Sequence, residues 1–539
     1  MAQELKGLGV GLKAAVGTVH IVAPAQPLPA WGKSSIGAEA EATRLKAAIA
    51  AVAHNLDELA AKADETTAEI FEALKMLLED DELFEVAETY LADGSDAAGA
   101  IGQAVNEFGE LLSGDAAFEE RVNDLQDLSR RVQANLAGIS VGLELPQTGQ
   151  IVLVGEDFSP ADTAQFTPAV VGVITRAGGP TSHTAIICRA RSIAAVVSVP
   201  DAFSLTDGAR VLVDPVGDRV VLDGQVSDAT AALTFIETDA EPIIPVRSNI
   251  GTAADAQVAA ATKANGVGLF RTELLYLSAA SQPSVEQQSA SYAEVLAAAP
   301  AGPIVVRTID AGSDKPVPFL NMPHEENPSL GVRGYRLITE HRQFIVDQLQ
   351  SLEFARAHTG REVWVMAPMI ATVAEAAEFA ELARSIGKFK VGIMIETPAI
   401  SMQVDRLQGV VDFVSIGTND LSQYLFAADR MNPALGALLN PWQPGLIRML
   451  SKIGTDGAAA GVSVGVCGES ASDPAFAVVL AGLGITSVSA SPSQVNVVSN
   501  ALAGVTMEQA REVATAALSG IDAATAKSAA LAKLAEFTA

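Results

Sequence analysis

The sequence FVSIGTND, residues 413–420, joins a short apolar run to a glycine and then to Asn419 and Asp420. A buried strand that ends in polar side chains is typical of βα barrels, whose strands carry the chemistry at their carboxyl ends. Similar runs, with helical stretches between most of them, are PVRSNIGT (245–252), GVGLFRTE (266–273), IVVRTID (304–310), VWVMAPM (363–369), VGIMIET (391–397), SVGVCGES (463–470) and SVSAS (487–491). Eight strands in all predict a (β/α)8 barrel over residues 244–539, with an open doubly wound sheet as the alternative.

The segments before residue 244 differ in composition. Alanine, leucine and glutamate dominate residues 36–138, and apolar residues recur there at helical spacing. Strand-like runs are found at residues 1–23, 150–157, 169–175, 194–199 and 209–215. We therefore predict an α/β domain from residues 1–23 plus 143–224, a helical insertion at 24–142, and a helical linker or hinge at 225–243. The fold class is thus multidomain α/β.

The bulk composition narrows the class of protein. The 539 residues carry a formal charge of −29, which opposes binding to nucleic acid. Two cysteines cannot form a disulfide framework, and both are expected as thiols in a reducing compartment. Charged residues interrupt any signal-peptide core near the N-terminus, and no stretch reaches the ~20 apolar residues of a membrane span. We expect a soluble cytoplasmic protein.

Charged side chains follow the predicted barrel strands. They are Arg271, Arg307, Asp310, Glu396, Asp420 and Glu469 at strand ends, and Lys315, Arg333 and Arg430 in the loops that follow. Several guanidinium groups together bind phosphate or carboxylate. Glu396 and Asp420 suit Mg²⁺, and Asn419 can donate to the same oxygens. A small phosphorylated carboxylic acid is the expected substrate. Cys467 has two interpretations, a proton donor or a buried filler, and by itself the filler is favoured.

A histidine lies in GGPTSHTAIICRA, residues 178–190. The glycines allow close approach to a ligand, the hydroxyls can orient an imidazole or a phosphate, and the helix that follows favours anions at its start. A neutral imidazole is a competent nucleophile near pH 7. We predict that His183 becomes phosphorylated. Because it lies outside the barrel, transfer requires its domain to swing about the linker.

Seven motifs resemble enzyme I of the bacterial phosphoenolpyruvate:sugar phosphotransferase system. They are GGPTSHTAIICR, GVGLFRTE, VVRTIDAGSDK, ENPSLGVRGYR, IMIETPA, FVSIGTNDLSQY and GVCGES, and they occur in order along nearly the whole chain. The resemblance implies that phosphoenolpyruvate phosphorylates the protein on histidine. The group then passes to the histidine-containing phosphocarrier protein, as the first step of sugar uptake. It also implies Mg²⁺ as cofactor and a homodimer formed through the barrel.

The resemblance also implies roles for single residues. His183 would accept the phosphoryl group on Nε2, with Arg189 steadying it. Arg271 and Arg307 would hold the phosphate, Glu396 and Asp420 the magnesium, and Asn419, Asp420 and Arg430 further parts of the substrate. Cys467 would protonate the enolpyruvate carbon, which reverses the filler interpretation. Lys315 and Arg333 lie in matching motifs as supporting residues. Pro180 departs from the family, which commonly has a basic residue there.

The helical insertion is strongly acidic. Residues 39–138 hold 23 acidic and 7 basic residues, a net charge of −16. Such charge usually marks a solvated face, but the resemblance implies a docking surface for the phosphocarrier protein. An apolar centre with an acidic rim fits a transient interface. The candidate docking residues are Met76, Leu77, Asp80, Asp81 and Glu82.

Two other functions are compatible with parts of the sequence. A pyruvate phosphate dikinase or phosphoenolpyruvate synthase shares the histidine domain and the barrel, but adds an ATP-binding domain, and no Gly-rich phosphate loop precedes His183. A non-catalytic scaffold that senses phosphoenolpyruvate is the second alternative. The intact set of His183, Glu396, Asp420 and Cys467 argues against it.

Overall fold

The computed structural model describes all residues except 1–3, 12, 23–30, 61–70, 72–73, 113–115, 140–142, 144, 147, 164, 180–181, 230–232, 234, 277–278, 280, 313–316, 321, 324, 431 and 539. The chain forms two compact units, Met1–Ala232 and Leu233–Ala539. Among the described residues, no helix is both long and apolar enough to cross a membrane.

The second unit contains a closed barrel of eight parallel strands. They are β9 (Val246–Ile250), β10 (Val267–Arg271), β11 (Ile304–Arg307), β12 (Val363–Ala367), β13 (Lys390–Ile395), β14 (Phe413–Ile416), β15 (Ser463–Val466) and β16 (Ser487–Ala490). Each strand pairs with the next in sequence, and β16 closes the circle on β9 with Val488 opposite Val246. The predicted barrel is therefore confirmed, and the open sheet is excluded because no strand edge is left unpaired.

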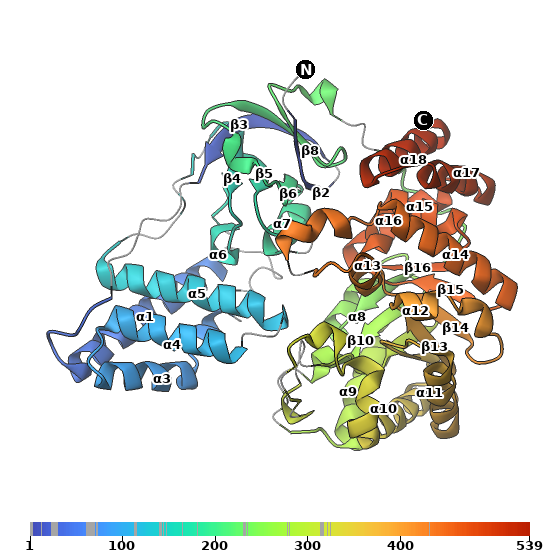
Figure 1. Ribbon diagram of the computed structural model, residues 1–539, viewed down its shortest axis with the longest axis horizontal. Coiled ribbons are helices and arrows are strands. Elements are labelled where there is room, and N and C mark those ends of the chain that lie inside the picture. The colour runs from blue at the N-terminus through green and yellow to red at the C-terminus, as the bar shows by residue number, and fades with distance from the viewer. Residues whose placement is uncertain are drawn as a thin grey trace. The chain divides into compact units, whose positions relative to one another are not determined.

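Helices surround the barrel strands (Figure 1). They are α8 (Ala253–Ala260), α9 (Val285–Ala298), α10 (Ile338–Thr359), α11 (Val373–Ile386), α12 (Pro398–Ser401), α13 (Thr418–Phe426), α14 (Pro444–Ala460), α15 (Pro474–Gly482), α16 (Val495–Ala503), α17 (Met507–Leu518) and α18 (Ala523–Thr538). Local sequence explains several of their starts. Thr252, Ser284, Thr372 and Thr506 each form a capping box with the residue three positions later, which satisfies two backbone donors that the first helical turn leaves free.

The first unit contains an eight-stranded sheet in the order β1-β8-β7-β3-β4-β5-β6-β2. The strands are β1 (Glu4–Lys6), β2 (Leu8–Val10), β3 (Ala15–Ile21), β4 (Ile151–Gly155), β5 (Val170–Thr175), β6 (Ala194–Val197), β7 (Arg210–Asp214) and β8 (Arg219–Leu222). β3, β4, β5 and β6 run parallel, and the other neighbours are antiparallel. The short helices α6 (Pro160–Thr163) and α7 (His183–Ala190) belong to this part.

Four longer helices of the same unit pack around a separate apolar core. They are α1 (Ala38–Ala60), α3 (Asp81–Ala92), α4 (Ala97–Leu112) and α5 (Ala116–Ala137). Arg131 of α5 is buried and connects them to the sheet part. Its guanidinium donates to Asp162 Oδ1 at 3.1 Å and to Ser159 Oγ at 3.2 Å. The boundaries of the predicted domains stay predictions.

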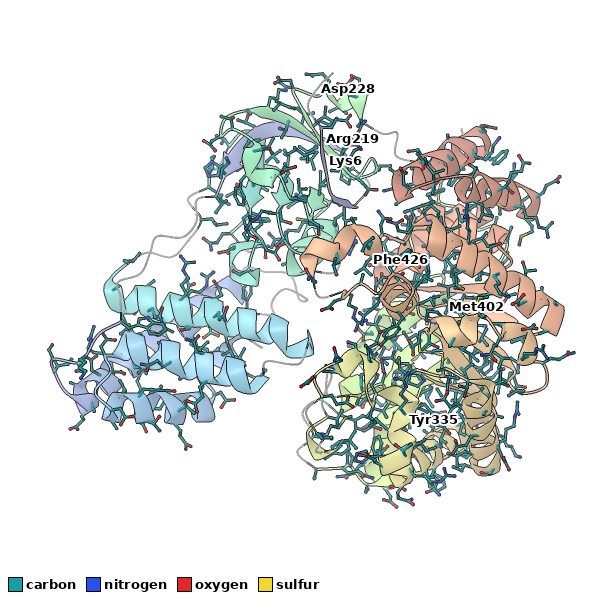
Figure 2. All side chains as sticks on the ribbon, in the orientation of Figure 1. Lys6, Arg219, Asp228, Tyr335, Met402 and Phe426 are labelled. Carbon is teal, nitrogen blue, oxygen red and sulfur yellow. The ribbon has the colours of Figure 1, made fainter. Side chains whose placement is uncertain are left out.

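The structure differs from the predicted helical linker at 225–243. Its described residues form only one turn of 3₁₀ helix, Val226–Asp228. Arg219 donates to Asp228 O at 2.8 Å, which anchors that turn to β8 (Figure 2). Leu233, Phe235 and Ile243 pack against the barrel core, so the segment is held by tertiary contacts that its local sequence does not reveal.

Candidate functional site

Six side chains at the carboxyl ends of the barrel strands form a chain of alternating charges. In order they are Glu273, Arg307, Asp310, Arg333, Asp420 and Arg430, called here the ion-pair chain. Because the strands are parallel, their carboxyl ends lie on one face of the barrel, and residues far apart in sequence meet there. Of the six, sequence reasoning had assigned roles to Arg307, Arg333, Asp420 and Arg430.

The distances along the ion-pair chain are short. Arg307 Nη2 contacts Glu273 Oε1, and Arg307 Nη1 lies 3.0 Å from Asp310 Oδ2. Arg333 joins Asp310 at 3.0 Å to Asp420 at 3.1 Å, and Arg430 reaches Asp420 at 3.3 Å. Asp310 and Arg333 are at most 1% exposed. Buried charges of this kind persist only when they are paired, and here the six formal charges cancel.

Arg307 keeps its charge although it is buried. Burial opposes the charged form, but Glu273, Asp310 and Glu396 together outweigh it and raise the pKa of Arg307 above its ordinary value. Among the described residues, Arg307 Nε and Glu273 Oε2 have no hydrogen-bond partner. Arg271 is more open, with 39% of its side chain exposed and Glu469 Oε1 3.6 Å away.

Glu396, directly after β13, is fully buried beside the ion-pair chain. Its Oε1 accepts a hydrogen bond from the Met369 backbone, while Oε2 has no partner among the described residues. Burial, together with the charges of Asp420 and Asp310, raises the pKa of Glu396 to about 7. A cation between Glu396 and Asp420 would relieve this repulsion.

The carboxylates of Glu396 and Asp420 are suitable protein ligands for Mg²⁺. Magnesium is bound by one or two carboxylates and completes its shell with water and substrate oxygens, so a larger protein cage is not required. Among the described residues, no cluster of three or more His, Cys, Asp or Glu could hold a metal ion.

Cys467 follows β15 and is 1% exposed. Asn249 of β9 donates to Cys467 O at 3.1 Å and accepts from Ser489 Oγ at 2.7 Å, while Cys467 N donates to Ile416 O at 3.0 Å. Burial raises the pKa of the thiol to about 11, against smaller lowering effects of Ser415 and Arg307. The thiol is therefore protonated at neutral pH and can donate a proton.

Asn419 lies in the first turn of α13, next to Asp420. Its Oδ1 accepts a hydrogen bond from Glu469 N at 3.3 Å, which links the ends of β14 and β15. Thr418 and Ser470 reinforce the same link through a hydroxyl contact of 2.9 Å. The predicted residue Lys315 lies outside the described residues.

The predicted phosphorylation site starts helix α7 in the other unit. His183 is its first residue and Ser182 its N-cap, with Ser182 Oγ accepting from Ala185 N at 3.4 Å. Thr184 is buried, and its single hydroxyl hydrogen is shared between Asp157 Oδ1 and Phe158 O. Pro180, Thr181 and the His183 side chain lie outside the description.

The backbone before His183 is held at Gly178. Its φ of +79° is left-handed, and an added Cβ would lie 2.8 Å from Asp157 Oδ2, so any larger residue would be strained there. Ser198 Oγ donates to Gly178 O. Arg189 is exposed in the last turn of α7, and its role toward His183 stays a prediction.

The predicted docking residues lie on both sides of the turn before α3: Met76 and Leu77 are in the helical residues 74–78, and Asp81 and Glu82 are in α3 itself. Met76 is 69% exposed, Leu77 is half-buried against the helical core, and Asp80 is exposed. Asp81 and Glu82 begin α3, and their side chains are outside the description. The exposed methionine beside Asp80 agrees with an apolar centre and an acidic rim. The docking role itself stays a prediction.

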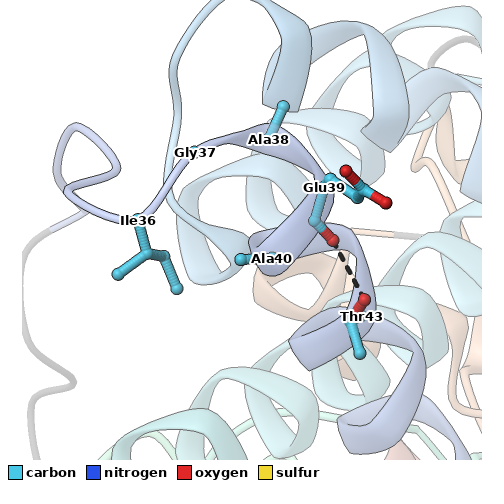
Figure 3. Close-up of a pocket in the computed structure, with 6 residues that line it drawn as sticks. All are labelled: Ile36, Gly37, Ala38, Glu39, Ala40 and Thr43. Carbon is cyan, nitrogen blue, oxygen red and sulfur yellow. Dashed lines mark hydrogen bonds between the residues drawn. The ribbon is translucent and has the colours of Figure 1, made fainter.

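A hollow at the start of α1 is lined by Ile36, Gly37, Ala38, Glu39, Ala40 and Thr43 (Figure 3). Its hydroxyl, on Thr43, donates to Glu39 O at 3.0 Å. With one carboxylate and one hydroxyl, this surface offers much less chemistry than the barrel strand ends.

Sequence reasoning gave no role to three residues that the structure brings into the site. Glu273 and Asp310 stand in the ion-pair chain, and Asn249 contacts Cys467 O. Glu273 and Asp310 end predicted strand runs, so their position was a signal, but their partners could not be read from the sequence.

Comparison with known proteins gives matches along the chain. Residues 6–121, 147–225 and 228–507 match the N-terminal, mobile and PEP-binding domains of the PEP-utilising enzymes. A phosphoenolpyruvate-protein phosphotransferase of Streptomyces coelicolor is 38% identical and covers 99% of this chain and 100% of its own. One of Haloferax volcanii is 36% identical over 95% and 96%. A multiphosphoryl transfer protein of Rhodobacter capsulatus is 36% identical over 87% of this chain and 61% of its own.

Proposed function

Because this chain belongs to the phosphoenolpyruvate-protein phosphotransferases, the enzyme I family, and is an enzyme of phosphoenolpyruvate-dependent phosphotransfer, we propose that His183 is its phosphoryl acceptor. We propose further that the group passes to a histidine-containing phosphocarrier protein, as the first step of sugar uptake. The observation that supports the proposal is the ion-pair chain at the carboxyl ends of the barrel strands, which lies beside the buried carboxyl of Glu396 and the buried, protonated thiol of Cys467.

The substrate would bind where the arginines are concentrated. Phosphoenolpyruvate carries several negative charges, which Arg307 and the more exposed Arg271 can neutralise. Phosphoryl transfer depends mainly on alignment and on such neutralisation. Glu396 and Asp420 would hold Mg²⁺, which when bound supplies further positive charge to the phosphate oxygens. Asn419 and Arg430 would contact the rest of the substrate.

The transfer step forms one bond to phosphorus and breaks another. The lone pair of His183 Nε2 forms a bond to phosphorus, and the bond between phosphorus and the enol oxygen breaks. The enolate that leaves takes a proton at its methylene carbon from the Cys467 thiol and becomes pyruvate. The resulting thiolate recovers its proton from water. The high pKa of Cys467 favours this recovery, because the protonated form is the stable one at neutral pH.

The proposal requires the two units to meet during each cycle. His183 belongs to Met1–Ala232 and the barrel to Leu233–Ala539. We propose residues 225–243 as the hinge, residues 24–142 as the carrier-binding insertion, and residues 1–23 with 143–224 as the phosphohistidine domain. We also propose a cytoplasmic homodimer formed through the barrel, to be measured by light scattering of the full chain.

Mass spectrometry at a pH that preserves phosphohistidine tests the acceptor. The chain incubated with phosphoenolpyruvate and Mg²⁺ should gain one phosphoryl group on the peptide that contains His183, and lose it when a phosphocarrier protein is added. His183→Ala should abolish the label, because it removes the nucleophile. His358→Ala, at an exposed histidine of α10, is the matched control and should label normally. Label that persists in His183→Ala, or that requires ATP, would contradict the proposal.

A further inference from the structure

Gln348 of α10 is a fully buried glutamine that contacts the ends of two barrel strands. Its Nε2 donates to Thr272 Oγ1 at 3.1 Å and to Tyr292 Oη at 3.0 Å. Its Oε1 accepts from Ile309 N at 3.0 Å. Both amide hydrogens and the carbonyl oxygen are therefore used.

The contacts of Gln348 lie next to both arginines proposed to hold the phosphate. Thr272 directly follows Arg271, and Thr272 Oγ1 donates to Arg307 O at 2.9 Å. Ile309 lies between Arg307 and Asp310, whose side chains form an ion pair. Gln348 thus links the end of β10 to the end of β11 in two ways. It bonds directly to Ile309 N, and it bonds to Thr272, which in turn bonds to Arg307 O.

Hydrogen bonds behind Gln348 allow only one orientation of its amide. Tyr276 donates its hydroxyl hydrogen to Gln288 Oε1 at 2.8 Å, so the hydrogen between the two tyrosine hydroxyls must come from Tyr292. Tyr292 Oη can then only accept from Gln348. Thr272 likewise accepts from Gln348, because its own hydrogen goes to Arg307 O. A flipped amide would place donor against donor at Ile309 N.

We infer that Gln348 is a positioning residue for substrate binding: it holds the strand ends that carry Arg271 and Arg307 at the spacing that phosphoenolpyruvate needs. The inference rests on the proposed function, since the two arginines are its phosphate ligands. Gln348 acts through hydrogen bonds to the backbone and to Thr272, and the ion pairs of Arg307 with Glu273 and Asp310 complete the arrangement.

Gln348→Met tests the inference, because methionine has a similar length and forms none of the three bonds. The KM for phosphoenolpyruvate in self-phosphorylation is expected to rise about tenfold or more, with a smaller fall in the rate at saturation. Unchanged KM in the folded variant would overturn the inference.

Tyr292→Phe is the matched control. It removes both hydrogen bonds of the Tyr292 hydroxyl, to Gln348 and to Tyr276, but leaves the bonds of Gln348 to Thr272 and Ile309. Its KM should stay within about twofold of the wild type, although it also loses buried hydrogen bonds. An increase as large as that of Gln348→Met would mean that the network acts only through stability, which would overturn the inference.

Gln348→Glu gives a second, independent variant. A neutral carboxylic acid keeps one acceptor and one donor, whereas a carboxylate would face the lone pairs of Thr272 and Tyr292. The ratio of its KM to that of the wild type should therefore fall toward one as the pH is lowered from about 8 to about 6. A ratio that does not change with pH would contradict the inference. This test remains available if Gln348→Met does not fold.

Calorimetric titration with phosphoenolpyruvate and Mg²⁺ separates this inference from the proposed function. If the wild type binds the compound but His183 gains no label, the proposed function fails. The affinity difference between wild type and Gln348→Met still decides the role of Gln348: weaker binding by the variant supports it, and equal binding overturns it.

Discussion

The barrel strand ends and the turn around His183 hold their polar side chains in different ways. At the strand ends, six charged groups are interlocked and mostly buried. Around His183, the described contacts are hydrogen bonds: Thr184 to Asp157 and Phe158 O, and Ser198 to Gly178 O. One region is organised by paired charges, and the other by a helix cap and a glycine turn.

This difference agrees with two separate tasks. A site for a small polyanion needs cations that are already in place, because assembling them during binding would cost affinity. His183, the proposed phosphoryl acceptor, needs a defined position from which the group can be passed on. The comparison predicts that variants of the two regions affect different measurable steps.

The largest expected effect compares the two buried cysteines, one in each unit. Cys467→Ala should lower the rate of pyruvate release by about 10²- to 10⁴-fold, because it removes the proposed general acid. Cys188 lies in the apolar core beside β5 and β6, and burial raises the pKa of its thiol to about 12. Cys188→Ala should leave pyruvate release unchanged. A coupled assay of pyruvate with a phosphocarrier protein present measures both variants.

Equal losses in the two cysteine variants would break the comparison. They would mean that turnover depends on the burial of a thiol and not on its position at the barrel strand ends.

The next effect is a pH dependence of barrel stability that comes from Glu396. The pKa of Glu396 is raised from 4.5 to about 7 by burial and by Asp420, so in this range the folded protein binds a proton that the unfolded chain has released. The free energy of unfolding should therefore fall as pH rises from about 4.5 to about 7, by up to about 3 kcal/mol. Glu396→Gln should remove this fall, because glutamine does not titrate.

Denaturant unfolding with a metal chelator, and without substrate, measures this slope through the fluorescence of Trp364 and Trp442 in the barrel unit. Addition of Mg²⁺ should flatten the wild-type slope and leave that of Glu396→Gln unchanged. An identical pH slope in wild type and variant would show that Glu396 is not the titrating group.

The smallest effect concerns the backbone before His183. Gly178 and Gly208 have φ values of +79° and +81°, but an added Cβ meets Asp157 Oδ2 at 2.8 Å only at Gly178, and nothing within 4 Å at Gly208. Both alanine variants should lose about 1 kcal/mol of stability from the backbone. Only Gly178→Ala should also slow labelling, about three- to tenfold, because it displaces the turn that leads to His183.

Single-turnover experiments measure the labelling rate of Gly178→Ala and of Gly208→Ala. Calorimetry should show that both variants bind phosphoenolpyruvate with wild-type affinity. Slower labelling by Gly208→Ala would show that left-handed strain alone accounts for the effect.

Local patterns were sufficient for most of the fold. Short apolar runs followed by glycine or polar residues predicted all eight barrel strands, because strand period and turn chemistry depend on neighbouring residues. The same rule directed attention to Arg271, Arg307, Glu396, Asp420 and Cys467, since parallel strands end on one face. The linker was predicted wrongly as a helix, because its conformation depends on contacts of Leu233, Phe235 and Ile243 with the barrel.

Partnership between distant residues could not be predicted in this way. Arg333 and Asp420 are 87 positions apart and Asn249 and Cys467 are 218 apart, yet each pair is in hydrogen-bond contact. Which carboxylate neutralises which guanidinium, and why Glu396 Oε2 has no hydrogen-bond partner among the described residues, follows from how the strand ends come together in the barrel. Composition and periodicity report which face of an element is buried. Charge pairing depends on distances across the barrel, and these distances are set only when β16 pairs with β9 and closes the barrel.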